Sequence, residues 1–222
     1  MTPGKIRNEK YELISEDEEM EIYQEELNYV NKNLETKFSC GIIVEMVRNQ
    51  TDEVIINTIQ KSIALRKKYP DLICGIDLAG DENNFRTFQE LTPSMIKNDD
   101  KDLPWILHCG ETTKGSNYNL VDAIQHDPKR IGHCLNLFKL GILSEYIKNK
   151  QIILEINPIS NQTLKQIRDL RIHPCIRYHN EGIKCTINND DPTLYNTKGV
   201  KYDFLVVAAA IEFDLLDLNV LD

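Results

Sequence analysis

Residues 38–78 read FSCGIIVEMVRNQTDEVIINTIQKSIALRKKYPDLICGIDL and carry the pattern on which the fold prediction depends. The run 38–46 is apolar and β-branched, as in a strand that is buried on both faces. A segment with apolar residues at helical spacing follows, between a capping Thr51 and the helix-ending Pro70. A second apolar run, 72–78, comes next. The stretch therefore predicts a strand, a helix and a second strand.

The same alternation continues toward the C-terminus. Four more short apolar runs, separated by helix-compatible sequence, are expected to be strands: 105–108, 130–133, 152–156 and 183–187. Alternation of this kind favours parallel strands joined by right-handed crossovers, in an α/β layer or a barrel. Residues 13–36 form a strongly acidic segment whose apolar residues have near-helical spacing, which predicts an amphipathic helix. The pattern of residues 202–218 predicts a last helix.

Composition excludes several classes of protein. The 222 residues are 41% hydrophobic, which suffices for one domain with a sizeable core. Lys and Arg number 26 against 35 Asp and Glu, and this net charge of −9 disfavours binding to nucleic acid or to anionic membranes. No apolar run is long enough for a membrane span, and the first 20 residues lack the apolar region of a signal peptide. The six cysteines form no CxxC pair, so we expect buried thiols.

Polar residues follow the predicted strands at the points where they end: Asp77, His108, His133, Asn157 and the pair Asp190-Asp191. In a parallel barrel these groups would gather at the C-terminal mouth, where catalytic residues lie. An open doubly wound sheet would spread them along a crevice instead. The pattern therefore indicates an active site at the strand ends.

His108 and Glu111, in HCGE, suit a metal ligand next to a proton donor. The alternative is a histidine bonded to a backbone carbonyl and a solvated loop carboxylate. His133 also has an alternative as a satisfied core histidine. Asp190 and Asp191 leave a buried strand together and would repel each other unless a cation or a proton neutralises one of them. The alternative there is a turn in which an Asp side chain binds its own backbone.

Taken together, the motifs resemble those of the adenosine deaminase family, a branch of the metal-dependent hydrolases. They occur in the order of that family: GIDLAGDE (75–82), HCGET (108–112), RIGHC (130–134), EINPISNQTL (155–164) and NNDDP (188–192). The resemblance covers roughly residues 38–210. Residues 157–174 and 198–204 look most like the adenosine deaminase-related growth factor branch, whose members are typically secreted.

The resemblance implies a (βα)8 TIM-type barrel with one Zn²⁺ at its mouth. The reaction would be the hydrolysis of adenosine or 2′-deoxyadenosine to inosine or 2′-deoxyinosine and ammonia. The partner would be a small-molecule purine nucleoside, and a homodimer of the full-length protein is compatible with the resemblance. Secretion is implied by the resemblance alone.

The resemblance also assigns roles to individual residues. His108 and Asp190 would be metal ligands. Glu111 would protonate a purine ring nitrogen. His133 and Asp191 would orient and deprotonate the zinc-bound water. Gly80 would offer its backbone N–H to the purine, and Asp191 would also contact the substrate.

Three departures from the family pattern stand out. The family takes two further zinc ligands from a His-x-His pair on its first strand, and none of the five histidines here lies two residues from another. Six predicted strands also fall short of the eight that close a barrel. We therefore expect residues 1–222 to be a single partial barrel domain, with a polar start and acidic helix in 1–36 and strands 3 to 8 of the barrel in 37–222. Cys109 and Cys134 stand where the family usually has Ala and Gly.

Two other functions stay open at this point. The chain could be a catalytically inactive remnant or binding protein that lacks the metal, because two ligands are too few for a tight zinc site. A related deaminase of AMP would need basic residues near the mouth to hold the phosphate, and Lys114 and Lys198 are the candidates.

Overall fold

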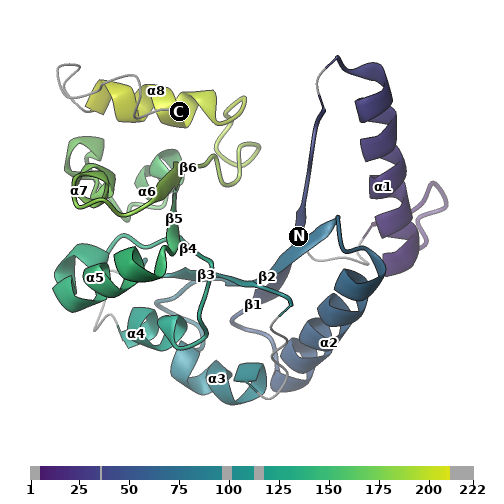
Figure 1. Ribbon diagram of the computed structural model, residues 1–222, viewed down its shortest axis with the longest axis horizontal. Coiled ribbons are helices and arrows are strands. Elements are labelled where there is room, and N and C mark those ends of the chain that lie inside the picture. The colour runs from purple at the N-terminus through teal and green to yellow at the C-terminus, as the bar shows by residue number, and fades with distance from the viewer. Residues whose placement is uncertain (1–5, 36, 97–101, 113–117, 211–222) are drawn as a thin grey trace. The chain divides into compact units, whose positions relative to one another are not determined.

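The computed structural model describes residues 6–35, 37–96, 102–112 and 118–210 (Figure 1). Helices and strands alternate along these residues. The helices are α1 (Glu16–Asn33), α2 (Asp52–Lys68), α3 (Phe88–Ile96), α4 (Tyr118–Ile124), α5 (Gly141–Lys150), α6 (Pro158–Thr163), α7 (Cys175–Asn180) and α8 (Lys201–Ala210), with short 3-10 turns η1 (Leu137–Lys139) and η2 (Leu170–Ile172). The strands are β1 (Ile42–Val47), β2 (Ile73–Ala79), β3 (Trp105–Cys109), β4 (Arg130–His133), β5 (Ile153–Ile156) and β6 (Cys185–Ile187). Each of the six predicted strands is therefore confirmed.

The strands follow one another in the sheet as they do in the sequence, in the order β1-β2-β3-β4-β5-β6. β1 pairs with β2 in parallel, and so do β4 with β5 and β5 with β6. A doubly wound sheet reverses its strand order at a switch point, whereas a (βα)8 barrel keeps the sequence order. The described strands are six strands of an incomplete barrel, which confirms the predicted fold class.

The chain divides into two compact units. The first comprises residues Met1–Gly80 and Phe85–Ile106, and the second comprises Asp81–Asn84 and Leu107–Asp222. Strand β3 begins in the first unit and ends in the second. The prediction of a single domain over residues 1–222 stays a prediction.

In the first unit, α2 packs against β1, β2 and α3 (Figure 1). The Thr51 side chain caps this helix by accepting the Val54 N–H at 3.4 Å. Ile55 and Ile59 are fully buried along the face that the apolar spacing predicts. Strand β2 is buried on both faces over most of its length, as expected of a parallel strand covered by helices.

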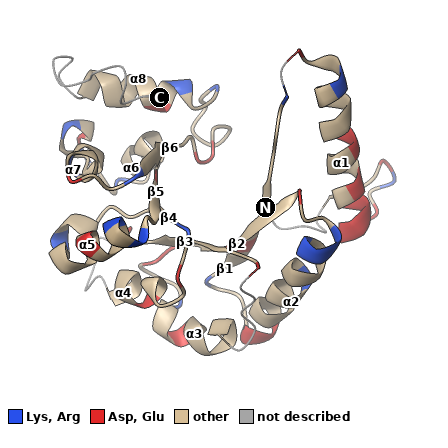
Figure 2. Ribbon diagram, viewed as in Figure 1, with Lys and Arg blue, Asp and Glu red and all other residues tan. Residues whose placement is uncertain are grey.

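The predicted acidic helix is confirmed as α1. Acidic residues crowd its first turn, where they complement the helix dipole (Figure 2). Ion pairs of Glu16 with Lys61 at 2.7 Å and of Asp17 with Lys68 at 2.8 Å join α1 to α2. These pairs are exposed and contribute little. The fully buried Met20 is expected to stabilise the attachment of α1 more than either ion pair does.

In the second unit, β5 lies between β4 and β6, and α8 packs on α6 and η2. Leu154 and Ile156 of β5 are completely buried. Helix α8 confirms the predicted last helix as far as residue 210, and the part predicted at 211–218 lies outside the described residues. No helix in the described ranges has the length and apolar character to cross a bilayer.

All six cysteines are unpaired thiols in the described chain. Cys109, Cys134 and Cys175 are buried, as the sequence predicts, whereas Cys40 is exposed. The expectation of a buried thiol is therefore wrong for Cys40, which precedes β1 instead of lying within it. Burial raises the pKa of Cys175 to about 11 and that of Cys185 to about 12, so both stay protonated at neutral pH.

Candidate active site

The carboxyl ends of β3 and β4 meet through backbone contacts. The Cys134 N–H donates to the Cys109 carbonyl at 3.1 Å, and the Asn136 N–H donates to the Gly110 carbonyl at 3.0 Å. Gly110 has a φ of +79°, and a Cβ there would lie 3.2 Å from the Cys134 Cα. Glycine is thus required at this position both by the backbone conformation and by the close approach of the next strand.

The imidazoles of His108 and His133 lie side by side, with ring centroids 5.2 Å apart. Gly132 makes room for this arrangement, because a Cβ on it would lie 3.1 Å from His108 ring atoms. His133 itself has a φ of +59°, in the left-handed region that non-glycine residues seldom adopt. Such a conformation costs on the order of 1–3 kcal/mol and is concentrated at functional sites.

Two carboxylates face the buried His133 ring. Its Nε2 lies 3.8 Å from Glu111 Oε2 and 3.7 Å from Asp190 Oδ2. The side chains are 4%, 14% and 20% exposed for His133, Glu111 and Asp190, so their electrostatic interactions are screened less than those at the surface. Asp190 also has a left-handed backbone, with a φ of +55°. The strand-end residues His108, Glu111, His133 and Asp190 therefore form one cluster.

Asp191 follows Asp190 in the loop after β6 and is exposed. The phenol of Tyr195 has a raised pKa, mainly because of burial and further because of the negative charges of Asp190, Asp191 and Glu111. The three carboxylates therefore act electrostatically on one hydroxyl group. Tyr195 is held by a 3.0 Å hydrogen bond between its hydroxyl and the Ser160 hydroxyl, and its N–H donates to the Asp191 carbonyl.

The loop that carries Glu111 is held from two sides. The buried carboxylate of Glu82 accepts the N–H groups of Gly110 at 3.1 Å, Glu111 at 2.7 Å and Thr112 at 2.8 Å. On the other side, the Asn136 Nδ2 donates to the carbonyls of Gly110 at 2.9 Å and Thr112 at 2.7 Å. Both the donors and the acceptors of this short loop are thus satisfied by buried side chains.

The loop after β6, which carries the two aspartates, is attached to α8 and α6. Asp203 is fully buried, and its Oδ2 accepts a hydrogen bond from Asn189 at 2.8 Å while its Oδ1 accepts the Ile159 N–H at 3.2 Å. Burial raises the pKa of Asp203, and the two donors act against that shift. This carboxylate fixes the residue immediately before Asp190.

Side-chain amides surround the far side of His133. Asn161 Nδ2 lies 2.8 Å from His133 Nδ1, and Asn157 Nδ2 lies 3.3 Å from the same atom. Asn161 also contacts Gln166, whose Nε2 donates to Glu111 Oε2 at 2.8 Å, and the buried His173. These amides belong to and follow α6, the helix after β5.

The chemistry of the cluster suits zinc, but the number of ligands is too small. His108 offers an imidazole nitrogen and Asp190 a carboxylate oxygen. Zinc binds both kinds of ligand. In the part of the chain that the structure describes, no group of three or more His, Cys, Asp and Glu side chains is placed to hold a metal ion. A complete site would need further ligands besides these two.

Gly80 belongs to the first compact unit, whereas the other predicted site residues belong to the second. It directly follows β2 and has a φ of +108°. Its predicted contact with the substrate stays a prediction. The spacing of residues in the sequence does not indicate the supporting residues, which are Glu82, Asn136, Asn161, Gln166, His173 and Asp203.

Parallel strands in sequence order, with imidazole and carboxylate groups at their carboxyl ends, define the class of protein: a barrel enzyme of the (βα)8 type. The model of one family, described as adenosine deaminase, matches residues 7–221. Human adenosine deaminase 2 is 34% identical over 223 residues, which cover 95% of this chain and 43% of the relative. The chain belongs to the adenosine deaminase family, and the match to adenosine deaminase 2 confirms the predicted growth factor branch.

The chain spans 35% to 43% of the length of the first curated relatives that it matches. The apo structure of the N6-methyl-AMP deaminase from Arabidopsis thaliana is similar to it with a TM-score of 0.76 and 21% identity, over 96% of this chain and 61% of that one. An amidohydrolase from Burkholderia ambifaria, solved with bound Zn, is similar with a TM-score of 0.62 and 17% identity. The match covers 77% of this chain and 46% of that one. At these identities the two structures support the fold alone.

Proposed function

We propose that this chain forms part of a zinc-dependent enzyme that hydrolyses adenosine or 2′-deoxyadenosine to inosine or 2′-deoxyinosine and ammonia. The observation that carries the proposal is the cluster at the strand ends, in which the buried His133 lies within 4 Å of the carboxylates of Glu111 and Asp190 and beside the His108 ring. A carboxyl group that can donate a proton, two imidazoles and a second carboxylate close together suit the addition of water to a purine carbon.

In this reaction a water oxygen adds to the amino-bearing carbon of the purine, and ammonia leaves. Glu111 would give its proton to the neighbouring ring nitrogen, which makes that carbon electrophilic. Gln166 already donates to Oε2 of Glu111, so Oε1 is the oxygen that would carry this proton. His133 would orient the attacking water, and Asp191 would accept its proton. Gly80 would contact the purine edge.

His108 and Asp190 would hold the metal ion, together with two ligands that this chain does not supply. Zinc, when bound, lowers the pKa of a coordinated water toward about 7 and so favours a nucleophile at neutral pH. The choice of zinc rests on the chemistry of these two donors, an imidazole and a carboxylate, which are ligands that zinc takes.

Neither alternative function gains support from a particular contact. Deamination of AMP would need a phosphate-binding residue, but Lys198 is exposed and Lys114 lies outside the described residues. An inactive binding protein would share the cluster and lack turnover, so only an assay separates it from the enzyme.

The test uses a chimera in which this chain replaces the matching segment of human adenosine deaminase 2. The purified chimera and the 222-residue chain are each incubated with zinc and adenosine, 2′-deoxyadenosine or AMP, and inosine and ammonia are measured. We expect the chimera to deaminate the nucleosides and the chain alone to show no turnover. The matched control is Glu111→Gln in the chimera, which keeps the shape and removes the proton, and should cost about 10²–10⁴-fold in kcat.

Two results would overturn the proposal. A folded, zinc-loaded chimera that binds adenosine without deaminating it would support the inactive binding protein. Turnover of AMP in preference to the nucleosides would support the nucleotide deaminase.

A further inference from the structure

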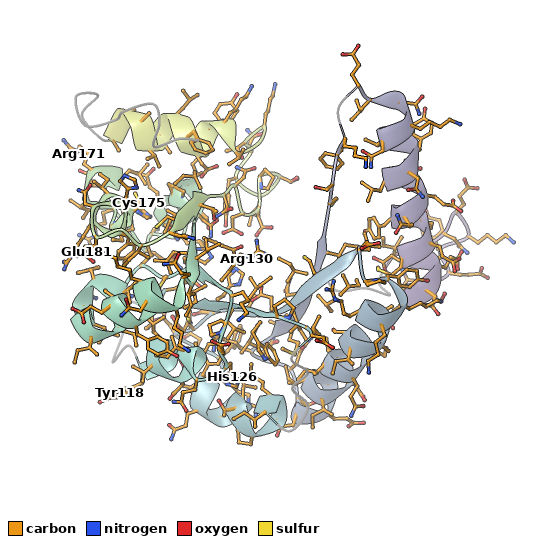
Figure 3. All side chains as sticks on the ribbon, in the orientation of Figure 1. Tyr118, His126, Arg130, Arg171, Cys175 and Glu181 are labelled. Carbon is orange, nitrogen blue, oxygen red and sulfur yellow. The ribbon has the colours of Figure 1, made fainter. Side chains whose placement is uncertain are left out.

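A continuous set of buried hydrogen bonds runs from the start of α7 to the cluster. It begins at the backbone N–H of Cys175, which donates to His173 Nδ1 at 3.1 Å. Figure 3 labels Cys175, at the start of α7. His173 Nε2 lies 3.1 Å from Asn161 Oδ1, and Asn161 Nδ2 lies 2.8 Å from His133 Nδ1. The exposed fractions of His173, Asn161 and His133 are 4%, 0% and 3%, so bulk water does not compete for these bonds.

The direction of every bond in this set follows from its first donor. A backbone N–H can only donate, so His173 Nδ1 is an acceptor. Burial lowers the pKa of His173 to about 4, with a smaller effect from His133, so the ring is neutral at pH 7 and its one proton is on Nε2. Asn161 must therefore present its oxygen to His173 and its NH₂ group to His133.

The other branch from Asn161 gives the same direction independently. The second N–H of the Asn161 amide donates to Gln166 Oε1 at 2.9 Å, which leaves the Gln166 NH₂ group to donate to Glu111 Oε2 at 2.8 Å. Glu111 Oε2 can only accept this hydrogen bond, both in an ionised carboxylate and in a carboxyl group whose proton is on Oε1. Reversing Asn161 would turn the Gln166 oxygen toward Glu111 and place two acceptors against each other.

We infer that Asn161 and His173 are positioning residues that fix His133 as the tautomer with its proton on Nε2. An amide donor at Nδ1 requires a lone pair on that nitrogen, so a neutral His133 carries its proton on the other one. That nitrogen lies 3.7 Å from Asp190 Oδ2 and 3.8 Å from Glu111 Oε2. Asn157 Nδ2, at 3.3 Å and 3.4 Å from the two ring nitrogens, does not favour either tautomer.

This inference refines the proposed function, and its consequence for catalysis rests on that proposal. A His133 with a proton on Nε2 presents a hydrogen-bond donor to the reacting groups. It can therefore orient the oxygen of the attacking water but cannot remove a proton from it. Removal of that proton falls to a carboxylate, for which Asp191 is the candidate.

The tautomer can be measured on the 222-residue chain without metal or substrate. Histidines labelled with ¹⁵N give ring resonances whose long-range ¹H–¹⁵N couplings distinguish the two tautomers, and His133→Gln assigns the His133 signals by their loss. We expect an excess of the Nε2–H form on the order of tenfold or more, which one buried hydrogen bond can supply. Because the measurement needs no turnover, it can fail or succeed independently of the deaminase proposal.

Variants test the two positioning residues. Asn161→Asp replaces the donor at His133 Nδ1 by an acceptor and should move the proton to Nδ1. His173→Phe removes the group that orients Asn161 and should abolish the excess, whereas His173→Gln keeps a donor and an acceptor and should retain it. The matched control, His179→Gln, changes an exposed histidine in α7 and should have no effect.

The dispersion of the amide resonances shows whether each variant is folded. If a variant is not folded, the measurement on the unaltered chain decides which tautomer His133 adopts. A His133 ring with its proton on Nδ1 in the unaltered chain would overturn the inference. So would a folded Asn161→Asp or His173→Phe variant whose His133 signals are unchanged.

Discussion

Glu82 Oε2 accepts the backbone N–H of Glu111 at 2.7 Å, across 29 residues of sequence. The same carboxylate accepts the N–H groups of the residues on either side, so it fixes the backbone of the proposed proton donor. A carboxylate is suited to this position because all its lone pairs face donors and a charged acceptor strengthens each bond.

Replacing Glu82 by Gln should therefore loosen the loop. The Gln NH₂ group would face a backbone N–H, and at least one donor would lose its acceptor. We expect a loss of about 1–3 kcal/mol in the free energy of unfolding, measured by urea denaturation, and faster amide hydrogen exchange at Gly110, Glu111 and Thr112. Asp81→Asn, at the exposed neighbouring position, is the control. Equal exchange rates in the two variants would show that Glu82 does not hold the loop.

Gly110 allows a second prediction. Ala at this position would adopt an unfavourable φ near +79° and place its Cβ 3.2 Å from the Cys134 Cα. We expect Gly110→Ala to lower the free energy of unfolding by about 1–3 kcal/mol. Gly141→Ala is the control, because a Cβ there meets nothing within 4 Å. If the two variants unfold at the same denaturant concentration, the strand ends do not approach as closely as described.

The third prediction concerns pH and His173. Its pKa is about 4 in the folded protein and near 6.5 in the unfolded chain, so the unfolded state binds more protons between these values. The free energy of unfolding should then fall as the pH falls from 6.5 to 4, by an amount on the order of 3 kcal/mol, and the contribution should level off below pH 4. His173→Gln should remove this contribution to the pH dependence of the free energy of unfolding.

Urea titrations of the two proteins at pH 7, 6, 5 and 4.5 provide the measurement. The Asp169 carboxyl, whose pKa its neighbour Arg171 lowers to about 2, contributes to the pH dependence of both proteins alike and therefore cancels in the comparison. Parallel pH dependences of the unaltered protein and His173→Gln would contradict the burial of a neutral imidazole.

The sequence predicted the strands well because each is a short apolar run that must be buried. β4 has the predicted bounds, and β5 differs by one residue at its start. The cluster of His108, Glu111, His133 and Asp190 was also predicted, since residues that follow parallel strands lie at the same edge of a sheet.

The supporting residues could not be predicted in the same way. Asn161 and Gln166 lie in a polar stretch that is typical of a surface helix, and their burial follows from packing between distant segments. His173 follows no predicted strand, and no spacing rule connects it with His133 forty residues earlier. A polar side chain whose partner lies far away in sequence leaves no periodic signal.

Asp203 gives the last prediction. Its carboxylate is buried and binds Asn189 and the Ile159 N–H, so Asp203→Ala would leave two donors without an acceptor. We expect a loss of about 2–4 kcal/mol in the free energy of unfolding, and in the chimera a fall in kcat, because Asn189 precedes Asp190. Asp203→Asn keeps one acceptor oxygen and should recover part of both losses. Tyr202→Ala, next to it on α8 and exposed, is the control for a general effect on the helix. A stable Asp203→Ala chimera with unchanged kcat would show that the loop carrying Asp190 is held by other contacts.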